Sequence, residues 1–390
     1  MLRAPIRRTI PTIPFALLAL LSGCSSNADD TNAADASPDA TQANDAASDG
    51  AAGQDGTAIV EAGDDAPDLS DGASSDGVSP FDAGPFDAAE GHVLAEYPAV
   101  DGGVASWDLV APIVNAPRTA LATKLDAQSA GTDQWANLAR DGASIAFVTT
   151  RFGCQSGDCL AVASGDGSSA SLVEHAAGTE IVAAGRPAIA SGGALIVYPS
   201  VASDAGHSED LYAIKKTASV WGAPTLLTAA MTAPYAHDLA LSADASKVVF
   251  DCGPTEYQAP ASDICTANTD GSGTSIVIAH TAGPGAVATS VTHHPDFAPD
   301  GTIVFEADWA GTEQVWRFTA PSSFAVVAPS QTNDNSPCVL PDGRIASLWL
   351  DGPGNAGSLH ELKVMSADGA SYVMAVTGID IIDTGQSCGM

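Results

Sequence analysis

The stretch His293–Phe318, HHPDFAPDGTIVFEADWAGTEQVWRF, places the pair Asp300–Gly301 between two runs of alternating apolar residues. Asp-Gly in this setting predicts a β-hairpin, because both residues tolerate the positive φ angles of tight hairpin turns. The adjacent histidines at its start, with Asp296 nearby, suggest instead a metal or acid–base site. Whether the stretch recurs in the chain decides which of the two features carries more weight.

The strand–turn–strand pattern does recur when the chain is compared with itself. Its turns are spaced at steps of 51, 52, 56 and 42 residues, at Asp141, Gly192, Asp244, Asp300 and Asp342. Each copy continues with a third apolar strand, and most copies add a fourth. No long segment of helical period interrupts the series, so we expect helices to be almost absent. Four antiparallel strands per repeated unit predict an all-β fold, a β-propeller.

The two ends of the repeat region indicate how the ring closes. Five units run from Gln134 to Gly378, which leaves Gly91–Ala130 in front and Ile379–Met390 behind. The tail GQSCGM aligns with the start of a first strand, so that Cys388 falls opposite Cys338. We therefore expect six four-stranded blades, with the C-terminal strand completing the front blade and removing exposed sheet edges. A seven-bladed ring is the alternative.

The turn sequences carry a resemblance to a known family. FAPDGTIVF (Phe297–Phe305) and VLPDGRIAS (Val339–Ser347) resemble the TolB-type propeller repeat. The resemblance covers roughly Gln134–Gly378 and is most specific in the last three units. It implies a propeller that binds peptides at a polar channel mouth without chemistry. No segment resembles the separate N-terminal domain of TolB, so the resemblance implies the propeller alone, residues 91–390.

The first 24 residues have the pattern of an export signal. A basic start precedes the apolar stretch Ile13–Leu21, which is too short to span a membrane, and LSGC then ends at Cys24. The pattern resembles a bacterial lipoprotein signal peptide, residues 1–23, and implies lipidation of Cys24. Ser25 is compatible with transfer to the outer membrane, facing the periplasm or the surface. An ordinary secretory signal with an incidental cysteine is the alternative.

Residues 24–90 differ from the rest of the chain in composition. Between Ser25 and Glu90 there are 16 acidic residues and no Lys or Arg, and the only aromatics lie in PFDAGPFDA (Pro80–Ala88). So few apolar side chains cannot offset the entropy of ordering the chain. We expect a disordered acidic tether that holds the propeller away from the membrane.

Charge and cysteine content restrict the partners and the compartment. The remaining chain has 31 acidic against 11 basic residues, which excludes nucleic acid as a partner. The six cysteines other than Cys24 favour disulfides in an oxidising compartment, and the absence of a C-x-x-C pair argues against zinc. Alignment of the blades predicts three disulfides, Cys154–Cys159, Cys252–Cys265 and Cys338–Cys388.

Candidate site residues lie just before the first strand of each unit, where they should surround one mouth of the central channel. These polar, aromatic and ionisable side chains are Trp135, Arg186, His237, Asp238, His293, His294 and Asn335. We expect no cofactor, although three of them, His237, His293 and His294, have the donor type to hold a divalent metal. Asp238 and Asp296 would then orient these ligands from the second coordination shell.

Together these observations predict a lipid-anchored, monomeric propeller of the cell envelope that binds an envelope protein or peptide at its channel mouth. The membrane would be contacted through the lipid anchor only, and no catalytic residue is assigned. One alternative is a metal-dependent carbohydrate-active enzyme, a lyase or hydrolase, using His237, His293 and His294. A purely structural envelope protein is the other.

Overall fold

The computed structural model describes residues 91–97, 106–110, 118–175, 178–201, 208–233, 235–254, 260–327, 333–350, 360–376 and 386–390. The signal peptide, Cys24 and the acidic tether lie outside these residues, so their predictions stay predictions. Contacts divide the chain into Met1–Gly72 and Ala73–Met390, and every described residue belongs to the second unit. In the described part of the chain, no helix has the length and apolar character needed to cross a membrane.

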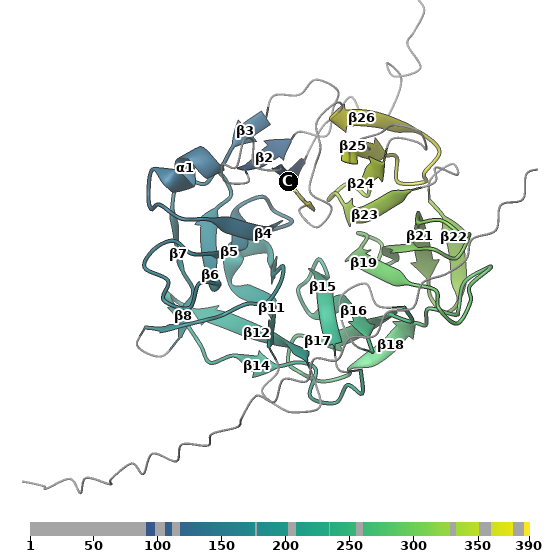
Figure 1. Cartoon of the computed structure of the whole chain (residues 1–390), viewed down its shortest axis with the longest axis horizontal. Coiled ribbons are helices and arrows are strands. Elements are labelled where there is room, and N and C mark those ends of the chain that lie inside the picture. The colour runs from purple at the N-terminus through teal and green to yellow at the C-terminus, as the bar shows by residue number, and fades with distance from the viewer. Residues whose placement is uncertain are drawn as a thin grey trace, which may run out of the picture. The chain divides into compact units, whose positions relative to one another are not determined.

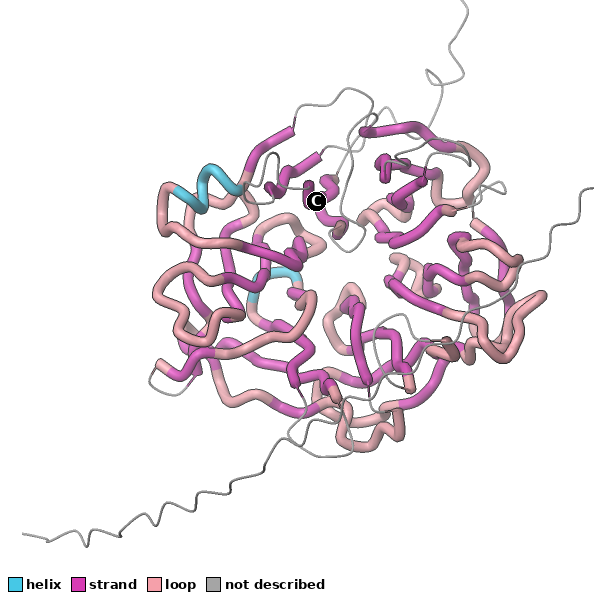
Figure 2. Tube along the Cα trace, viewed as in Figure 1, coloured by secondary structure: helices cyan, strands magenta, loops and turns pink. Residues whose placement is uncertain are grey.

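The described residues form six sheets, four of which are regular meanders of consecutive antiparallel strands. Figure 1 shows the sheets arranged around a common centre, and Figure 2 shows how little helix accompanies them. The four regular blades are β4 (Asp133–Leu138), β5 (Ser144–Thr149), β6 (Cys159–Ser164) and β7 (Ala170–Leu172); β15 (Tyr235–Leu241), β16 (Lys247–Gly253), β17 (Asp263–Asn268) and β18 (Ser275–Ile278); β19 (Thr292–Phe297), β20 (Ile303–Ala307), β21 (Gln314–Thr319) and β22 (Ser323–Val326); and β23 (Asp334–Val339), β24 (Ile345–Leu350), β25 (His360–Met365) and β26 (Tyr372–Val376).

The C-terminal strand closes the ring, which confirms that prediction. The closing sheet has the order β27-β1-β2-β3 and consists of β27 (Ser387–Gly389), β1 (His92–Tyr97), β2 (Ser106–Val110) and β3 (Arg118–Ala120). Cys388 in β27 is paired with Val93 in β1. The first and last strands of the propeller therefore pair in one sheet, so neither is left as an unpaired strand at a chain end.

The remaining sheet departs from the predicted pattern. Its meander of β10 (Ala188–Ile189), β11 (Leu195–Val201), β12 (Glu209–Thr217) and β14 (Thr225–Leu226) is extended by β13 (Val220–Trp221), β8 (Glu174–His175) and β9 (Thr179–Glu180). His175 pairs in parallel with Trp221, so residues that follow one blade join the outer side of the next. Regular consecutive-strand blades therefore number four where six were predicted, and the other two sheets are this seven-stranded one and the closing sheet.

The Asp-containing turns form as the sequence predicts. Between β19 and β20 the Asp300 carboxylate accepts hydrogen bonds from the Thr302 backbone N–H at 3.0 Å and the Thr302 hydroxyl at 2.7 Å. Gly301 has φ +83°, a conformation that glycine adopts without a steric penalty. These two bonds also hold the pKa of Asp300 below its usual range.

Apolar side chains from neighbouring sheets interlock between the blades. One cluster combines Val249 and Ile264 of the β15–β18 blade with Phe305, Trp309 and Trp316 from the β19–β22 blade and the loop that follows β20. All three predicted disulfides are present, with Cα–Cα distances of 5.9, 5.8 and 5.6 Å for Cys154–Cys159, Cys252–Cys265 and Cys338–Cys388. The apolar clusters and the Cys338–Cys388 disulfide connect neighbouring sheets, whereas the other two disulfides lie within single blades.

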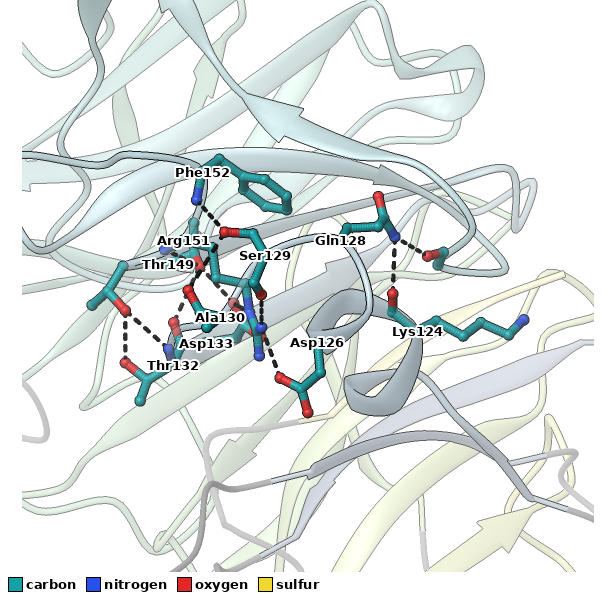
Figure 3. A network of polar contacts seen from close by, with 12 residues as sticks. Lys124, Asp126, Gln128, Ser129, Ala130, Thr132, Asp133, Thr149, Arg151 and Phe152 are labelled. Carbon is teal, nitrogen blue, oxygen red and sulfur yellow. Dashed lines mark hydrogen bonds and ion pairs between the residues drawn. The ribbon is translucent and has the colours of Figure 1, made fainter.

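Helix α1 (Ala122–Asp126) belongs to the connection between the closing sheet and β4, and Arg151 holds this connection in place (Figure 3). The fully buried Arg151 guanidinium contacts the Asp133 carboxylate at 2.7 Å and Asp126 at 2.8 Å, and it donates to the Ser129 carbonyl. Burial raises the pKa of Asp133, although the Thr149 hydroxyl and Arg151 oppose this effect. The network sets the position of β4 relative to the closing sheet.

Candidate binding site at the channel mouth

The innermost strand of each sheet lines the centre of the ring: β4, β10, β15, β19, β23 and β27. We call the end at which these strands begin the upper end, and the end at which they reach the Asp-containing turns the lower end. Four of the inner strands have a β-bulge at the same place, where the register with the second strand shifts. Each bulge contains one non-glycine residue with positive φ: Trp135 (54°), Asp238 (36°), His294 (48°) and Ser336 (47°).

This repeated backbone conformation costs free energy and changes the direction of the side chains. A non-glycine residue in the left-handed region costs about 1–3 kcal/mol, and bulges redirect the side chains that they carry. Here the bulges direct side chains of successive blades toward one another near the upper end. Trp135, Asp238 and His294 are among the predicted mouth residues, but they lie within the first strands and not before them.

Five residues near the upper end form a closed circuit of polar contacts through side chains and two backbone carbonyls, which we call the channel ring. His294 Nε2 lies 3.1 Å from Asp238 Oδ2, and the Ser336 hydroxyl lies 3.4 Å from His294 Nδ1. Gln386 donates from its side-chain amide to the Ser336 carbonyl, and Arg186 donates to the Gln386 carbonyl. Arg186 Nη2 lies 3.9 Å from Asp238 Oδ1, which completes the circuit.

Most of the predicted mouth residues are buried. Arg186, Asp238, His293, His294 and Asn335 have exposed fractions of 9, 3, 4, 3 and 3%. The predicted set is brought together at the upper end, but only Trp135 and His237 remain partly accessible there. Trp135 also packs against the apolar cluster that contains Ile189 and Tyr198.

Each of the three histidines is paired with a carboxylate through Nδ1. His237 contacts Glu209 at 2.9 Å, His293 contacts Asp251 at 3.1 Å, and His294 contacts Glu306 at 3.0 Å. These carboxylates come from the second or third strands β12, β16 and β20, which alignment of the first strands alone does not reveal.

Burial and the neighbouring charges act in opposite directions on the pKa values of His237 and Asp238. Burial acts to lower the pKa of His237, but the Glu209 hydrogen bond and the Asp238 charge raise it to about 9. Burial acts to raise the pKa of Asp238, but the charges of His294, His237 and Arg186 hold it below its usual range. At neutral pH His237 is therefore an imidazolium, and it is partly accessible at the mouth.

The His237 ring is held between two neighbours. The Tyr235 ring stacks on it with centroids 5.6 Å apart and an interplanar angle of 18°. Gly185 approaches so closely that a Cβ at that position would lie 2.2 Å from His237 Cε1. A glycine is therefore needed at position 185 to leave space for this imidazole.

Arg140 closes the lower end of the channel. Its guanidinium contacts Asp296 and donates to the Phe297 carbonyl, each at 2.6 Å, and it reaches the carbonyls of Leu241 and Val339 at 3.4 Å. These partners belong to three different inner strands. Asp296, expected to support a metal site, is instead the partner of Arg140, because its strand carries it beyond the bulge to the lower end.

Sequence reasoning did not identify Arg140, although a signal was present. The turn that reads ARDG at Ala139–Gly142 corresponds to APDG at Ala298–Gly301 and LPDG at Leu340–Gly343. A charged residue where two other copies have proline is the feature that distinguishes this blade.

A small cavity lies between the channel ring and Arg140. Its volume is about 50 Å³, and Asn137, Asp238, Asp296, Cys338 and Cys388 are among its lining residues. A water molecule occupies about 30 Å³ in the liquid, and pockets for small organic ligands usually measure about 300–1,000 Å³. The cavity therefore has room for a few water molecules and for no organic substrate.

A metal site needs at least three ligand atoms that lie close to one another. Over the described ranges, only Cys154, Cys159 and Glu180 bring three His, Cys, Asp or Glu ligand atoms within 4.8 Å of one another. Those two cysteines form a disulfide. The three histidines of the hypothesis do not form such a group in this arrangement.

Comparisons with known proteins support the fold. No family model matches the chain, and a search of curated proteins returns no match. TolB from Acinetobacter baumannii superposes with a TM-score of 0.56 at 11% identity, over 77% of this chain and 67% of that chain. A putative TolB from Agrobacterium tumefaciens (TM-score 0.48, 20% identity, 66% and 85% covered) and an oligogalacturonate lyase in complex with manganese (0.45, 15%, 70% and 71%) follow. The first similarity shows a β-propeller fold of the kind found in TolB. The TM-scores of the other two are too low to support a conclusion.

Proposed function

We propose that this chain is a cell-envelope β-propeller that binds a protein or peptide on the upper face of its channel and performs no chemistry there. One observation carries the proposal: the cavity between the channel ring and Arg140 has a volume of only about 50 Å³. Since a substrate cannot enter, a ligand must bind across the mouth, and an extended or folded polypeptide is suited to such a surface.

The accessible chemistry of the mouth suits a polypeptide. Trp135 offers a partly exposed aromatic surface, and His237 offers an imidazolium. Gln134, also partly exposed, donates a side-chain hydrogen bond to Asp158 at 3.3 Å and can exchange it for a ligand carbonyl. Aromatic side chains and a few hydrogen-bonding groups are the usual energetic centre of a protein interface.

The location of the protein is part of the same proposal. LSGC at Cys24 supports an exported lipoprotein in the outer membrane, facing the periplasm or the surface, with no other membrane contact. Gly91, directly after the tether, lies near Gly389 and Leu340 at the lower end. The chain therefore enters the propeller at the end opposite the mouth.

Site-specific photocrosslinking in cells tests the proposal. A benzophenone amino acid replaces Trp135 at the mouth in one strain and Val326, an exposed residue of the outer strand β22, in the control strain. We expect position 135 to give one discrete crosslinked protein, reduced at least five-fold by His237→Ala, and position 326 to give none. Equal labelling at both positions, or none at 135, would instead support a purely structural envelope protein.

The metal-dependent carbohydrate-active enzyme is a second proposal, favoured by one observation. All three histidines have Nδ1 held by a carboxylate, the arrangement that commonly orients imidazole ligands toward a metal through Nε2. Metal analysis of the purified chain beside a His293→Ala, His294→Ala variant is the test. A stoichiometric metal that is lost in the variant supports the enzyme, and a metal-free wild-type protein argues against it.

A further inference from the structure

The last five residues connect several blades at the centre of the molecule. Gln386 bonds to Arg186 and to the Ser336 carbonyl, and so supplies two of the contacts of the channel ring. The Ser387 hydroxyl accepts the Leu138 N–H at 2.7 Å. At the lower end the Met390 N–H donates to the Arg140 carbonyl at 3.0 Å. The C-terminal strand thus contacts both ends of the cavity.

Backbone pairing alone provides β27 with little support. The strand is three residues long and pairs within its sheet only with β1, through His92↔Gly389, Val93↔Cys388 and Leu94↔Ser387. A strand this short has few ladder hydrogen bonds to hold it against fraying at a chain end. Another constraint is therefore needed to keep Gln386 in the channel ring.

The Cys338–Cys388 disulfide provides that constraint. It joins β23 to β27, two different sheets, and spans 50 residues of sequence. Cys252–Cys265 joins adjacent strands of one blade, and Cys154–Cys159 closes the loop before β6. Cys388 lies two residues from Gln386, and both cysteines of the inter-sheet bond line the cavity.

We propose that oxidation of Cys338 and Cys388 completes the channel ring, so that the mouth becomes competent to bind only after export to an oxidising compartment. The inference rests on the proposed function, because it concerns the assembly of the same mouth. Two thiols lose two protons and two electrons to a disulfide of an envelope thiol oxidase, which leaves as a dithiol. In a reducing compartment β27 detaches, and Arg186 and Ser336 lose their Gln386 contacts.

Burial makes this oxidation a single assembly step rather than a reversible switch. The exposed fractions of Cys338 and Cys388 are 5 and 6% in the closed ring. A thiolate must reach a sulfur atom to reduce the bond, so the assembled disulfide is shielded. Cys154, which is partly exposed, belongs to the bond that a reductant reaches more easily.

The test compares two disulfide variants of the full-length chain by hydrogen exchange. In Cys338→Ser, Cys388→Ser we expect the amides of Ser387–Gly389 and of their partners in β1 to exchange at least ten-fold faster than in the wild type. The control, Cys252→Ser, Cys265→Ser, removes a bond within one blade and should leave these amides within two-fold of the wild type. Equal exchange in the two variants, whether fast or slow, overturns the proposal.

A second measurement separates this inference from the proposed function. Photocrosslinking from position 135 should fall at least five-fold in the Cys338, Cys388 variant and stay within two-fold in the control. Gln386→Ala, which keeps the disulfide, should lower crosslinking without accelerating exchange at Gly389, so a folding defect cannot imitate the result. If the wild type gives no crosslink while the exchange difference stands, the binding function fails and the oxidative assembly of the ring is retained.

Discussion

The two ends of the channel are closed by different sets of contacts. At the lower end one residue, Arg140, reaches three inner strands and is neutralised by Asp296. At the upper end closure is distributed over five residues in or just before five inner strands, with the 3.9 Å separation between Arg186 and Asp238 as its longest contact. The lower closure depends on one guanidinium with four partners, whereas the upper circuit contains one long contact at which a ligand can rearrange it. This difference agrees with binding at the upper end, which the small cavity and the accessible side chains of the mouth support.

The largest effect should come from cutting the covalent link between the blades that close the ring. A bond across 50 residues constrains the unfolded chain by about 4 kcal/mol, and the bond across 13 residues by about 3 kcal/mol. We expect Cys338→Ser, Cys388→Ser to lower the free energy of unfolding more than Cys252→Ser, Cys265→Ser, measured by urea denaturation of the oxidised proteins. The reverse order would show that native contacts, and not chain entropy, dominate.

Removal of the lower closure should be the next largest effect. Arg140→Ala leaves the Asp296 carboxylate buried without its ion-pair partner, which should cost about 3 kcal/mol of the free energy of unfolding. Arg140→Ala with Asp296→Asn removes both charges and should recover part of the loss. A cost below about 1 kcal/mol for the single variant would mean that water replaces the guanidinium, and that the lower closure does not depend on it.

The pH dependence of stability reports on the upper end. Because the folded state raises the pKa of His237 to about 9, its contribution is complete below its unfolded pKa near 6.5. That contribution is lost as the pH rises through about 9. We expect a loss of about 3 kcal/mol across this window, measured by urea midpoints. In His237→Ala the slope should disappear, and a slope that persists would assign it to another group.

The smallest effect tests how the mouth holds its charged group. Gly185→Ala should displace the His237 ring and destabilise the fold by about 1 kcal/mol, because the added methyl overlaps the imidazole. NMR titration should show the pKa of His237 falling from about 9 toward its ordinary value. In a His237→Ala background the same substitution should have almost no effect on stability. A full effect in that background would place the clash elsewhere.

The architecture could be predicted from particular residues. Asp-Gly turns such as Asp300–Gly301 mark hairpins through local backbone preference, which the rest of the fold does not alter. The alignment of Cys388 with Cys338 predicted closure by the C-terminal strand and the disulfide that accompanies it, and both are confirmed. The seven-stranded sheet was not predicted, because pairing of His175 with Trp221 joins segments with no common pattern.

The candidate site was predicted only in part. Trp135, Asp238 and His294 were predicted to lie at the mouth, and all three lie in equivalent bulges. The carboxylate partners of the three histidines were not predicted, because Glu209, Asp251 and Glu306 lie on second or third strands, whereas the candidate residues were taken only from the start of each unit.

By itself, the sequence determined the repeat, the closure of the ring and the cysteine pairs, since each depends on local turn chemistry or on register along a strand. Only the tertiary structure decided that the histidines pair with carboxylates, that Asp296 belongs to Arg140 and that Gln386 joins Arg186 to Ser336. Those contacts arise where separate blades meet at the channel. Residues from several blades converge there at distances that depend on every blade at once, and no single stretch of sequence encodes them.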